Sequence, residues 1–258
     1  MTNYQGIVFF DLDGTLWDDH KLVPDNTVKA IKQLTKNNYL PVINSGRSPF
    51  EIKQRTNTTG INSFVALDGS YVQVDGKTIY TDPIPNDLVQ SVINKTNELH
   101  EVVSFYNKEN YAISGVTDLA KESYKYNFTP FPKINTDFYQ DNPVLMMVIQ
   151  TRSHEQDYRD AFKGKLDFFR TGSKIIDTVM YGQSKQKGIQ NLIAKSDLTN
   201  VPTYAFGDGN NDIPMFECVD HPIAMGNGID KVKDLSEHVT DTNLNDGIPK
   251  ALKHYDLI

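Results

Sequence analysis

The sequence predicts an α/β protein whose core is a doubly wound, mainly parallel, Rossmann-like sheet interrupted by an inserted α+β domain. Short apolar runs alternate with amphipathic segments up to about residue 81. A linker-like stretch (TDPIP) then opens a region in which strands follow one another directly, and strand–helix alternation resumes at residue 184. Such alternation is typical of parallel sheets covered by helices. We therefore expect a discontinuous core of residues 1–81 and 184–258, and a second domain over residues 82–183.

The first core segment begins with a buried strand and an amphipathic helix. Residues 7–10 (IVFF) form a continuous apolar run, as in a strand covered on both faces. Val28, Ile31 and Leu34 then recur at helical spacing, which predicts a helix over residues 24–37 with a proline at its start.

Further strands follow around one short helix. Residues 39–44 (YLPVIN) have the composition of a strand, although Pro41 fits one poorly unless it lies at the beginning. Ser48 and Pro49 are typical of a helix N-cap and first position, so we expect a helix through about Arg55. Asp-Gly turns separate the remaining strands into a small antiparallel flap, and these strands cover 63–67, 71–74 and 78–80.

Periodicity and turn residues predict the remaining elements in the same way. In the insert, we expect helices at 86–99, 117–126 and 154–163, strands at 102–106, 110–114, 144–150, 166–170 and 175–180, and an irregular Pro-rich stretch before 144. In the second core segment, we expect helices at 186–195, 211–216 and 248–255, strands at 203–206 and 222–225, and then a short helix and a strand near Val239.

Composition narrows the class of protein. The chain has 258 residues, with 26 Lys and Arg against 33 Asp and Glu, and a formal net charge of −7. Such a surface repels polyanions, so we expect neither nucleic acid nor an anionic membrane as a partner. Cys218 is the only cysteine, which excludes an intrachain disulfide. Because no apolar run reaches the roughly 18–20 residues that span a bilayer and the first residues lack a basic signal-peptide region, we expect a soluble, cytoplasmic protein.

Two aspartates directly follow the first strand. Asp11 and Asp13 lie in the segment DLDGT, and ligands of an open parallel sheet bind beyond the carboxyl ends of its strands. Two residues apart on extended backbone, the two side chains can face the same side. Gly14 allows a sharp turn, and Thr15 offers a hydroxyl that can fix it. Carboxylates in solvated turns are common, so this pattern alone does not separate a site from a structural turn.

A second acidic cluster, GDGNND at 207–212, follows another apolar strand and opens a helix. An acidic N-cap explains one aspartate, but not both Asp208 and Asp212 together with a glycine turn. With Asp11 and Asp13, four carboxylates would converge on one sheet edge and raise one another's pKa. A hard divalent cation removes this repulsion, and all-oxygen ligands with phosphate as a co-ligand indicate Mg²⁺.

Two further segments offer groups that bind anions. Ser45, Gly46 and Arg47 lie between a strand and a helix N-terminus, where a hydroxyl and backbone N–H groups can bind phosphate oxygens. The alternative is a strand–helix turn that needs glycine. Lys185 begins the first helix after the insert, where a cation is unfavourable without an anionic partner. Lys187 could bind the anion instead of Lys185. The alternative for each of them is a solvated lysine on the surface.

Together these motifs resemble the haloacid dehalogenase-like phosphatase superfamily, in particular its Cof-type branch with the larger α+β cap. In chain order the motifs are DLDGT at 11–15, SGR at 45–47, SKQKGI at 184–189 and GDGNND at 207–212, with the insert between the second and the third. The resemblance covers essentially the whole chain, and the combined pattern is highly specific. It implies a catalytic core and a cap domain that selects the substrate.

The resemblance implies a role for each aspartate. Asp11 would attack phosphorus in line and form an aspartyl-phosphate. Asp13 would protonate the leaving alcohol and then deprotonate the hydrolytic water. The implied ligands of Mg²⁺ are Asp11, the backbone carbonyl of Asp13, Asp208, and Asp212 either directly or through water.

The resemblance also implies how phosphate is held. Ser45, with the Gly46 amide, would bind the transferring phosphoryl group, and Lys185 would neutralise it and pair with Asp11. We prefer Lys185 to Lys187 because an apolar helix face then follows at the family's spacing, although relatives usually have lysine and glycine adjacent.

Three other residues complete the implied substrate- and phosphate-binding set: Leu12, Arg47 and Asn211. For Arg47, pairing with a neighbouring carboxylate is an equal alternative. Many relatives have Asn-Gly where this chain has Asp68-Gly69, which adds a carboxylate near the site and leaves its role in substrate contact open.

The sequence therefore predicts a Mg²⁺-dependent phosphatase of small phosphorylated metabolites, sugar phosphates above all, that acts through an aspartyl-phosphate. A phosphomutase of the same superfamily is the alternative, and a catalytically silent metabolite-binding regulator is less favoured because Asp11 and Asp13 are both retained. A signalling receiver domain uses similar residues, but the motif order and the insert argue against it. We expect a monomer or small homo-oligomer. The insert is rich in aromatic residues, and we expect most of them in its core and one or two facing the substrate. They are Tyr111, Tyr124, Tyr126, Phe128, Phe131, Phe168 and Phe169.

Overall fold

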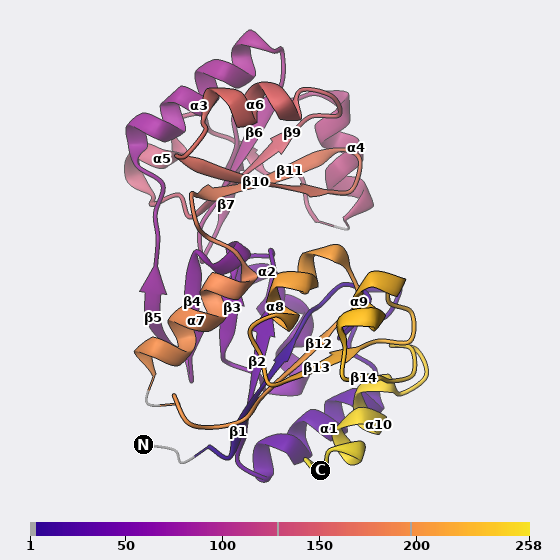
Figure 1. Ribbon diagram of the computed structural model, residues 1–258. Helices are drawn as coiled ribbons and strands as arrows, with labels where there is room; N and C mark the ends of the chain where they lie inside the picture. The colour runs from indigo at the N-terminus through magenta and orange to yellow at the C-terminus, as the bar shows by residue number, and fades with distance from the viewer. Residues whose placement is uncertain (1–3, 128, 197) are drawn as a thin grey trace. The chain divides into compact units, whose positions relative to one another are not determined.

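The computed structural model describes residues 4–127, 129–196 and 198–258, which form two compact units (Figure 1). The first unit is Met1–Tyr80 together with Ser184–Ile258, and the second is Thr81–Gln183. Phe128, one of the aromatic residues expected in the insert, lies outside the described residues, as do residues 1–3 of the expected core. Within the described ranges, no helix is long and apolar enough to cross a membrane.

An eight-stranded sheet forms the centre of the first unit, with the order β14-β13-β12-β1-β2-β3-β4-β5. The strands from β14 to β3 pair in parallel, and β4 pairs antiparallel to β3. The predicted doubly wound, mainly parallel fold class is therefore confirmed. The strands are β1 (Gly6–Phe10), β2 (Tyr39–Asn44), β3 (Phe64–Ala66), β4 (Tyr71–Val74), β5 (Lys77–Thr81), β12 (Thr203–Gly207), β13 (His221–Ala224) and β14 (His238–Val239).

Helices cover both faces of this sheet. Helix α1 connects β1 to β2, and α8 connects β12 to β13 on the other side of β1; because parallel crossovers are right-handed, these helices lie on opposite faces. Ile7 and Phe9 of β1 share one apolar cluster with Ile189 of α7 and Met215 of α8. The helices are α1 (Asp25–Lys36), α2 (Pro49–Thr56), α7 (Lys185–Lys195), α8 (Ile213–Phe216), α9 (Asp230–Leu235) and α10 (Gly247–His254), with 3₁₀ turns η1 (Asn57–Thr59), η2 (Leu67–Gly69) and η3 (Asn210–Asp212).

Pro41 lies inside β2 and not at its beginning. The N–H groups of Ile43 and Ser45 point toward β3, where they donate to Ser63 and Val65. In a strand, alternate residues point the same way, so the nitrogen of Pro41 also faces that side. Pairing of β2 with β3 begins only at Ile43, so the proline removes no hydrogen bond from this ladder.

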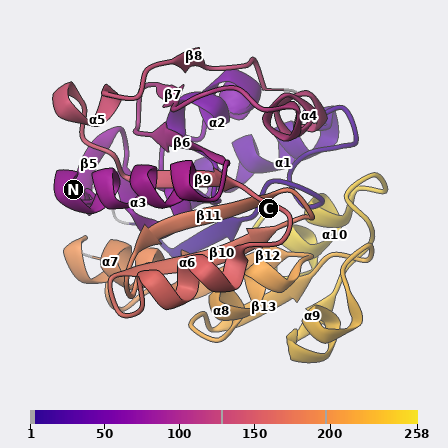
Figure 2. The ribbon, with the colours of Figure 1, turned by 90° about the horizontal axis from the view of Figure 1, so that it is seen from above.

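The second unit contains a six-stranded sheet with the order β10-β11-β9-β6-β7-β8, in which β7 and β8 pair in parallel and the other neighbours among the described residues pair antiparallel. Helices α3 and α6 lie over one face of this sheet (Figure 2), where α3 packs with Val103 and Ala112. Helix α4 packs with Val102 and Ile113, the neighbours of those two residues along the strands. Because successive side chains of a strand point to opposite faces, α4 covers the other face. The strands are β6 (Val102–Tyr106), β7 (Tyr111–Ile113), β8 (Lys133–Ile134), β9 (Met146–Gln150), β10 (Leu166–Thr171) and β11 (Ile175–Met180). The helices are α3 (Asn86–Glu98), α4 (Asp118–Tyr126), α5 (Phe138–Asp141) and α6 (Glu155–Ala161).

Two segments differ from the expectation. The stretch before 144 is not wholly irregular, because it contains β8 and α5; Phe138 and Tyr139 of α5 are buried in the core of this unit. Elements β8 and α5 are too short to show a periodic pattern in the sequence, so tertiary packing determines whether they form. The helix expected over 211–216 begins instead as the 3₁₀ turn η3, where Asp212 bonds backward to the preceding turn.

Candidate active site

The carboxyl ends of β1 and β12 bring Asp11 and Asp208 together. The two strands are parallel neighbours, with Phe10 opposite Phe206, and the N–H of Asp11 donates to the Phe206 carbonyl at 3.0 Å. Asp212 joins them from η3, so that one carboxylate oxygen from each aspartate lies within 4.8 Å of the others. Asp11 and Asp212 are buried. The sheet edge therefore carries a compact triad of carboxylates from two motifs that are distant in sequence.

Lys185 provides the positive charge within this triad. Its side chain is buried, and Nζ lies 2.5 Å from Oδ1 of Asp11 and 2.8 Å from Oδ1 of Asp212. Ser184 caps the helix by accepting the backbone N–H of Lys187 at 3.1 Å. The side chain of Lys187 is exposed. A lysine at a helix N-terminus opposes the helix dipole, and burial adds a desolvation cost. The carboxylates of Asp11 and Asp212 offset the helix dipole and the desolvation cost, and they hold the pKa of Lys185 well above its usual value.

The triad has more negative charge than Lys185 neutralises. Burial raises the pKa of Asp11 well above its usual value, and Asp212 and Asp208 raise it further, while Lys185 opposes them. Burial likewise raises the pKa of Asp208 to about 6, although the Thr15 hydroxyl donates to its Oδ1 at 2.8 Å. Buried carboxylates with raised pKa values favour binding of a proton or of a cation.

Asp13 does not join the triad, which corrects the expectation that four carboxylates converge. Arg47 donates from Nε to its Oδ2 at 3.0 Å, and Lys21 bonds its Oδ1. Burial works to raise the pKa of Asp13, but Arg47 and then Lys21 outweigh it and lower the pKa. The chain already turns at Leu12, whose carbonyl accepts the N–H groups of Thr15 at 3.3 Å and Trp17 at 2.9 Å, so the two aspartates do not stay on one extended face. No pattern in the sequence indicated this contact of Lys21.

The loop after β2 places Ser45, Gly46 and Arg47 beside this edge. Ser45 is buried, and its hydroxyl accepts the N–H of Arg47 at 3.2 Å. The guanidinium of Arg47 lies over the Trp17 ring, 5.0 Å from its centroid, in addition to its contact with Asp13. Arg47 therefore has the carboxylate partner that was one of its two expected roles. The N–H of Ser48 donates to Glu51 at 3.1 Å in a capping box at the start of α2.

The other expected ligand contacts lie in different surroundings. The side chain of Leu12 is fully buried in the apolar core, so only its backbone can reach a ligand. Asn211 is exposed, and its Oδ1 would lie 2.7 Å from a methyl group placed at Gly209. Asp68 is buried at the end of β3, with φ of 49°.

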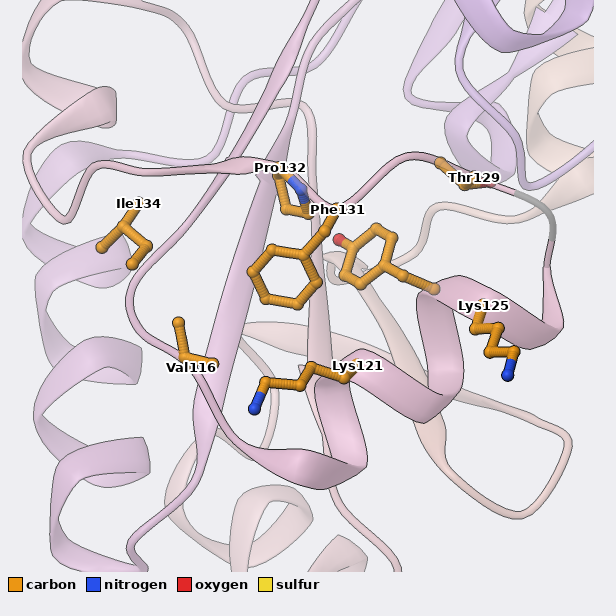
Figure 3. Close-up of a pocket in the computed structure, with 8 residues that line it drawn as sticks. Val116, Lys121, Lys125, Thr129, Phe131, Pro132 and Ile134 are labelled. Atoms are coloured by element: carbon orange, nitrogen blue, oxygen red, sulfur yellow. The ribbon is translucent and has the colours of Figure 1, made fainter.

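The second unit has a hollow of its own, of about 550 Å³. The side chains of Phe131, Val116 and Ile134 border it (Figure 3), and the Phe131 ring meets Tyr124 edge-on with 5.4 Å between centroids. Tyr124 is otherwise in the core, bonded through its hydroxyl to Ser104 at 2.7 Å. The remaining lining residues are Lys121, Lys125, Thr129 and Pro132. The hollow is thus apolar with lysines at its edge. Of the other expected aromatic residues, Phe168 is buried, whereas Tyr126 is exposed.

Comparison with known proteins places the chain among similar sequences and folds. The profile of a family described as haloacid dehalogenase-like hydrolase matches residues 8–252. A candidate phosphatase of Bacillus subtilis (strain 168) named YkrA is 29% identical, over 98% of each chain. A second protein of that strain, the 5-amino-6-(5-phospho-D-ribitylamino)uracil phosphatase YcsE, is 25% identical over 97% of this chain and 96% of its own. The solved structure of the sugar phosphatase BT4131, from subclass IIB of that superfamily, aligns with a TM-score of 0.80 and 26% identity, covering 98% of this chain and 99% of the other.

Proposed function

The chain belongs to the haloacid dehalogenase-like hydrolases, and from that premise we propose that it is a Mg²⁺-dependent phosphatase of small phosphorylated metabolites. The observation that carries this proposal is the buried contact of Lys185 with Asp11 and Asp212. A reactive carboxylate, a cation beside it and an adjacent hydroxyl loop are what phosphoryl transfer requires, because catalysis there is mostly positioning and charge neutralisation.

The donor set fits a hard divalent cation. Asp11, Asp208 and Asp212 offer carboxylate oxygens close enough for one ion. The family resemblance adds the backbone carbonyl of Asp13 as a further ligand. All-oxygen ligation favours Mg²⁺ over zinc or copper. The raised pKa values of Asp11 and Asp208 support this assignment, because a cation would keep both carboxylates ionised. When bound, Mg²⁺ would neutralise negative charge on the phosphoryl oxygens.

The reaction would proceed in two steps on Asp11. Its carboxylate oxygen forms a bond to phosphorus as the ester P–O bond breaks, and the leaving oxygen takes a proton from Asp13. Water then attacks the phosphorus of the aspartyl-phosphate while Asp13 takes a proton from that water. The bond between phosphorus and the Asp11 oxygen breaks, which releases inorganic phosphate and restores the Asp11 carboxylate. Ser45 and the Gly46 amide hold the transferring group, and Lys185 balances its charge. Asp13 must therefore exchange protons while paired with Arg47 and Lys21.

The substrate class we favour is a phosphate ester on a polyhydroxylated carbon chain. The BT4131 protein is named a sugar phosphatase, and YcsE is named for a phosphorylated ribityl compound. Both names describe phosphate on a sugar or sugar-alcohol carbon. The second unit would act as the cap that selects among such molecules, and Leu12, through its backbone, and Asn211 would add contacts.

The test is release of inorganic phosphate from a panel of sugar and sugar-alcohol phosphates by the Mg²⁺-loaded protein. Release above that of an Asp11→Asn control supports the phosphatase. Transfer of phosphate between hydroxyls without release would instead establish the alternative, a phosphomutase. Binding of phosphorylated metabolites without either reaction would indicate a silent regulator.

A further inference from the structure

The turn at the end of β3 brings an additional carboxylate to the phosphate loop. Asp68 is 8% exposed and has a left-handed backbone with φ of 49°. A methyl group placed at Gly46 would lie 3.1 Å from Oδ1 of Asp68, so the carboxylate stands against the loop of Ser45 and Gly46. The N–H of Leu67 donates to the Arg47 carbonyl at 3.2 Å, which ties the turn to that loop.

This carboxylate is poorly compensated. Its Oδ2 is buried and has no hydrogen-bond partner among the described residues. The cation that faces it is Lys185 of α7, which already bonds Asp11 and Asp212. Arg47, on the loop packed against it, directs its guanidinium to Asp13, and Lys187 is exposed. A buried polar atom without a partner needs an explanation in a native structure.

We propose that Asp68 is a specificity-determining residue, whose negative charge opposes doubly charged phosphate at the Ser45–Gly46 loop, so that phosphate binds together with a proton on the Asp68 carboxylate. This inference rests on the proposed function, because it takes that loop to be the phosphate site. The proton comes from solvent, adds to a carboxylate oxygen and returns to solvent when phosphate leaves. The ligand class favoured is therefore one that brings less negative charge.

Burial gives this coupling a definite pH range. It raises the pKa of Asp68 to about 6, against the opposing effect of Lys185. Below that pH the side chain is already neutral, and phosphate meets no added charge. Above it, each binding event requires a proton, so phosphate affinity is weakened by comparison with a protein that has a neutral residue at this position.

The experiment compares wild type with Asp68→Asn, which keeps the size of the side chain and removes its charge. Binding of inorganic phosphate to the Mg²⁺-loaded full chain is measured by calorimetry at pH 5 and pH 8. Comparing the two proteins at equal pH cancels the ionisation of phosphate itself. We expect equal dissociation constants at pH 5 and about 100-fold tighter binding by the variant at pH 8, which is two units above the pKa of Asp68. Asp75→Asn is the matched control, since Asp75 is also left-handed but exposed in the neighbouring turn, and it should behave as wild type.

An equal ratio of dissociation constants at both pH values would overturn the role of Asp68 while leaving the phosphatase intact. Absence of phosphate binding in all proteins at both pH values would overturn the proposed function as well. Should Asp68→Asn fail to fold, proton uptake by wild type decides the question. Titrations of wild type at pH 7.5 with sulfate, which stays doubly charged at this pH, in two buffers of different ionisation enthalpy should show uptake of about one proton per sulfate. Uptake of none would refute the inference.

Discussion

Nζ of Lys185 lies 2.8 Å from Oδ1 of Asp212, and the other carboxylate oxygen of Asp212 accepts the N–H groups of Asp208 and Gly209 at 2.9 and 3.0 Å. One aspartate therefore fixes both the turn after β12 and the lysine that begins α7. Because Lys185 also bonds Asp11 at the end of β1, a single ammonium group connects three segments of the site.

Replacing Lys185 with methionine leaves Asp11 and Asp212 buried without a cation. We expect the rate of phosphate release to fall at least about 100-fold, and the free energy of unfolding of the metal-free protein to fall by about 3–5 kcal/mol. Phosphate-release assays and urea denaturation measure the two effects. Lys187→Met, on the exposed side of the same helix, is the control and should change neither. Equal losses in both variants would contradict the choice of Lys185.

Asp11→Asn tests the nucleophile. The amide is a poor nucleophile, so we expect turnover to drop by about 1,000-fold or more. The fold should persist, because the change removes a buried carboxylate that is repelled by Asp212 and Asp208. Melting temperature and near-ultraviolet circular dichroism check the fold beside the rate measurement. Full activity in a correctly folded variant would place the nucleophile elsewhere.

Removal of the cation should act on stability as well as on activity. Chelation by EDTA should abolish phosphate release, and added Mg²⁺ should restore it. Chelation should also lower the melting temperature, because a ligand present at 100 times its dissociation constant stabilises the folded state by about 2.7 kcal/mol.

The effect of EDTA on stability should be larger at pH 8 than at pH 5.5. Burial raises the pKa of Asp208 to about 6, and raises that of Asp11 well above its usual value. A carboxyl whose pKa is higher in the folded than in the unfolded state binds its proton more tightly when folded. These groups therefore stabilise the metal-free protein as the pH falls through 6. Calorimetry with and without EDTA at both pH values measures the difference, and indifference to EDTA at both would count against a metal site.

Much of the fold followed from local pattern. The IVFF run predicted β1, because a strand buried on both faces is continuously apolar. The helical spacing of Val28, Ile31 and Leu34 predicted α1, because a helix that buries one side has apolar residues every three to four positions. Short elements such as β8 escaped prediction, since two residues carry no period and only pairing with β7 defines them.

The site was predictable where it depends on strand ends. Asp11 and Asp208 each follow an apolar strand, and parallel pairing of β1 and β12 brings them to one edge. The surroundings of Asp13 were not predictable, because Lys21 reaches it from a loop and no spacing in the sequence encodes that contact. The orphaned oxygen of Asp68 likewise depends on tertiary packing against the Gly46 loop.

The contact of Arg47 with Asp13 predicts a shift in the pH–rate profile. Arg47 is the largest influence lowering the pKa of Asp13 against burial, with Lys21 second. Arg47→Met removes that influence, so the pKa of Asp13 should rise, and the basic limb of kcat/KM, where the general acid loses its proton, should move to higher pH. Measuring kcat/KM between pH 4 and pH 9 gives the shift. Lys53→Met, from the next helix, serves as the control. An unchanged basic limb in Arg47→Met would mean that Asp13 is not the acid that titrates in this step.

A second pH effect, on stability alone, arises far along the sheet from the triad. The rings of His238 and His254 are stacked with centroids 4.3 Å apart, and Tyr255 meets both edge-on. Burial lowers the pKa of His238, and His254 lowers it further. The folded protein therefore binds this proton more weakly than the unfolded chain does, so the contribution to stability is complete above about pH 6.5 and is lost as the pH falls.

His254→Phe keeps an aromatic ring in the stack and removes the second titratable group. The free energy of unfolding should then decline less steeply between pH 7 and pH 5 than in wild type, as measured by urea denaturation in EDTA. Comparing proteins at equal pH cancels the opposing titration of the aspartate triad, which both share. His20→Gln, at an exposed loop position, should reproduce the wild-type decline. The same slope in His254→Phe as in wild type would mean that the stacked pair does not respond to protonation as one unit.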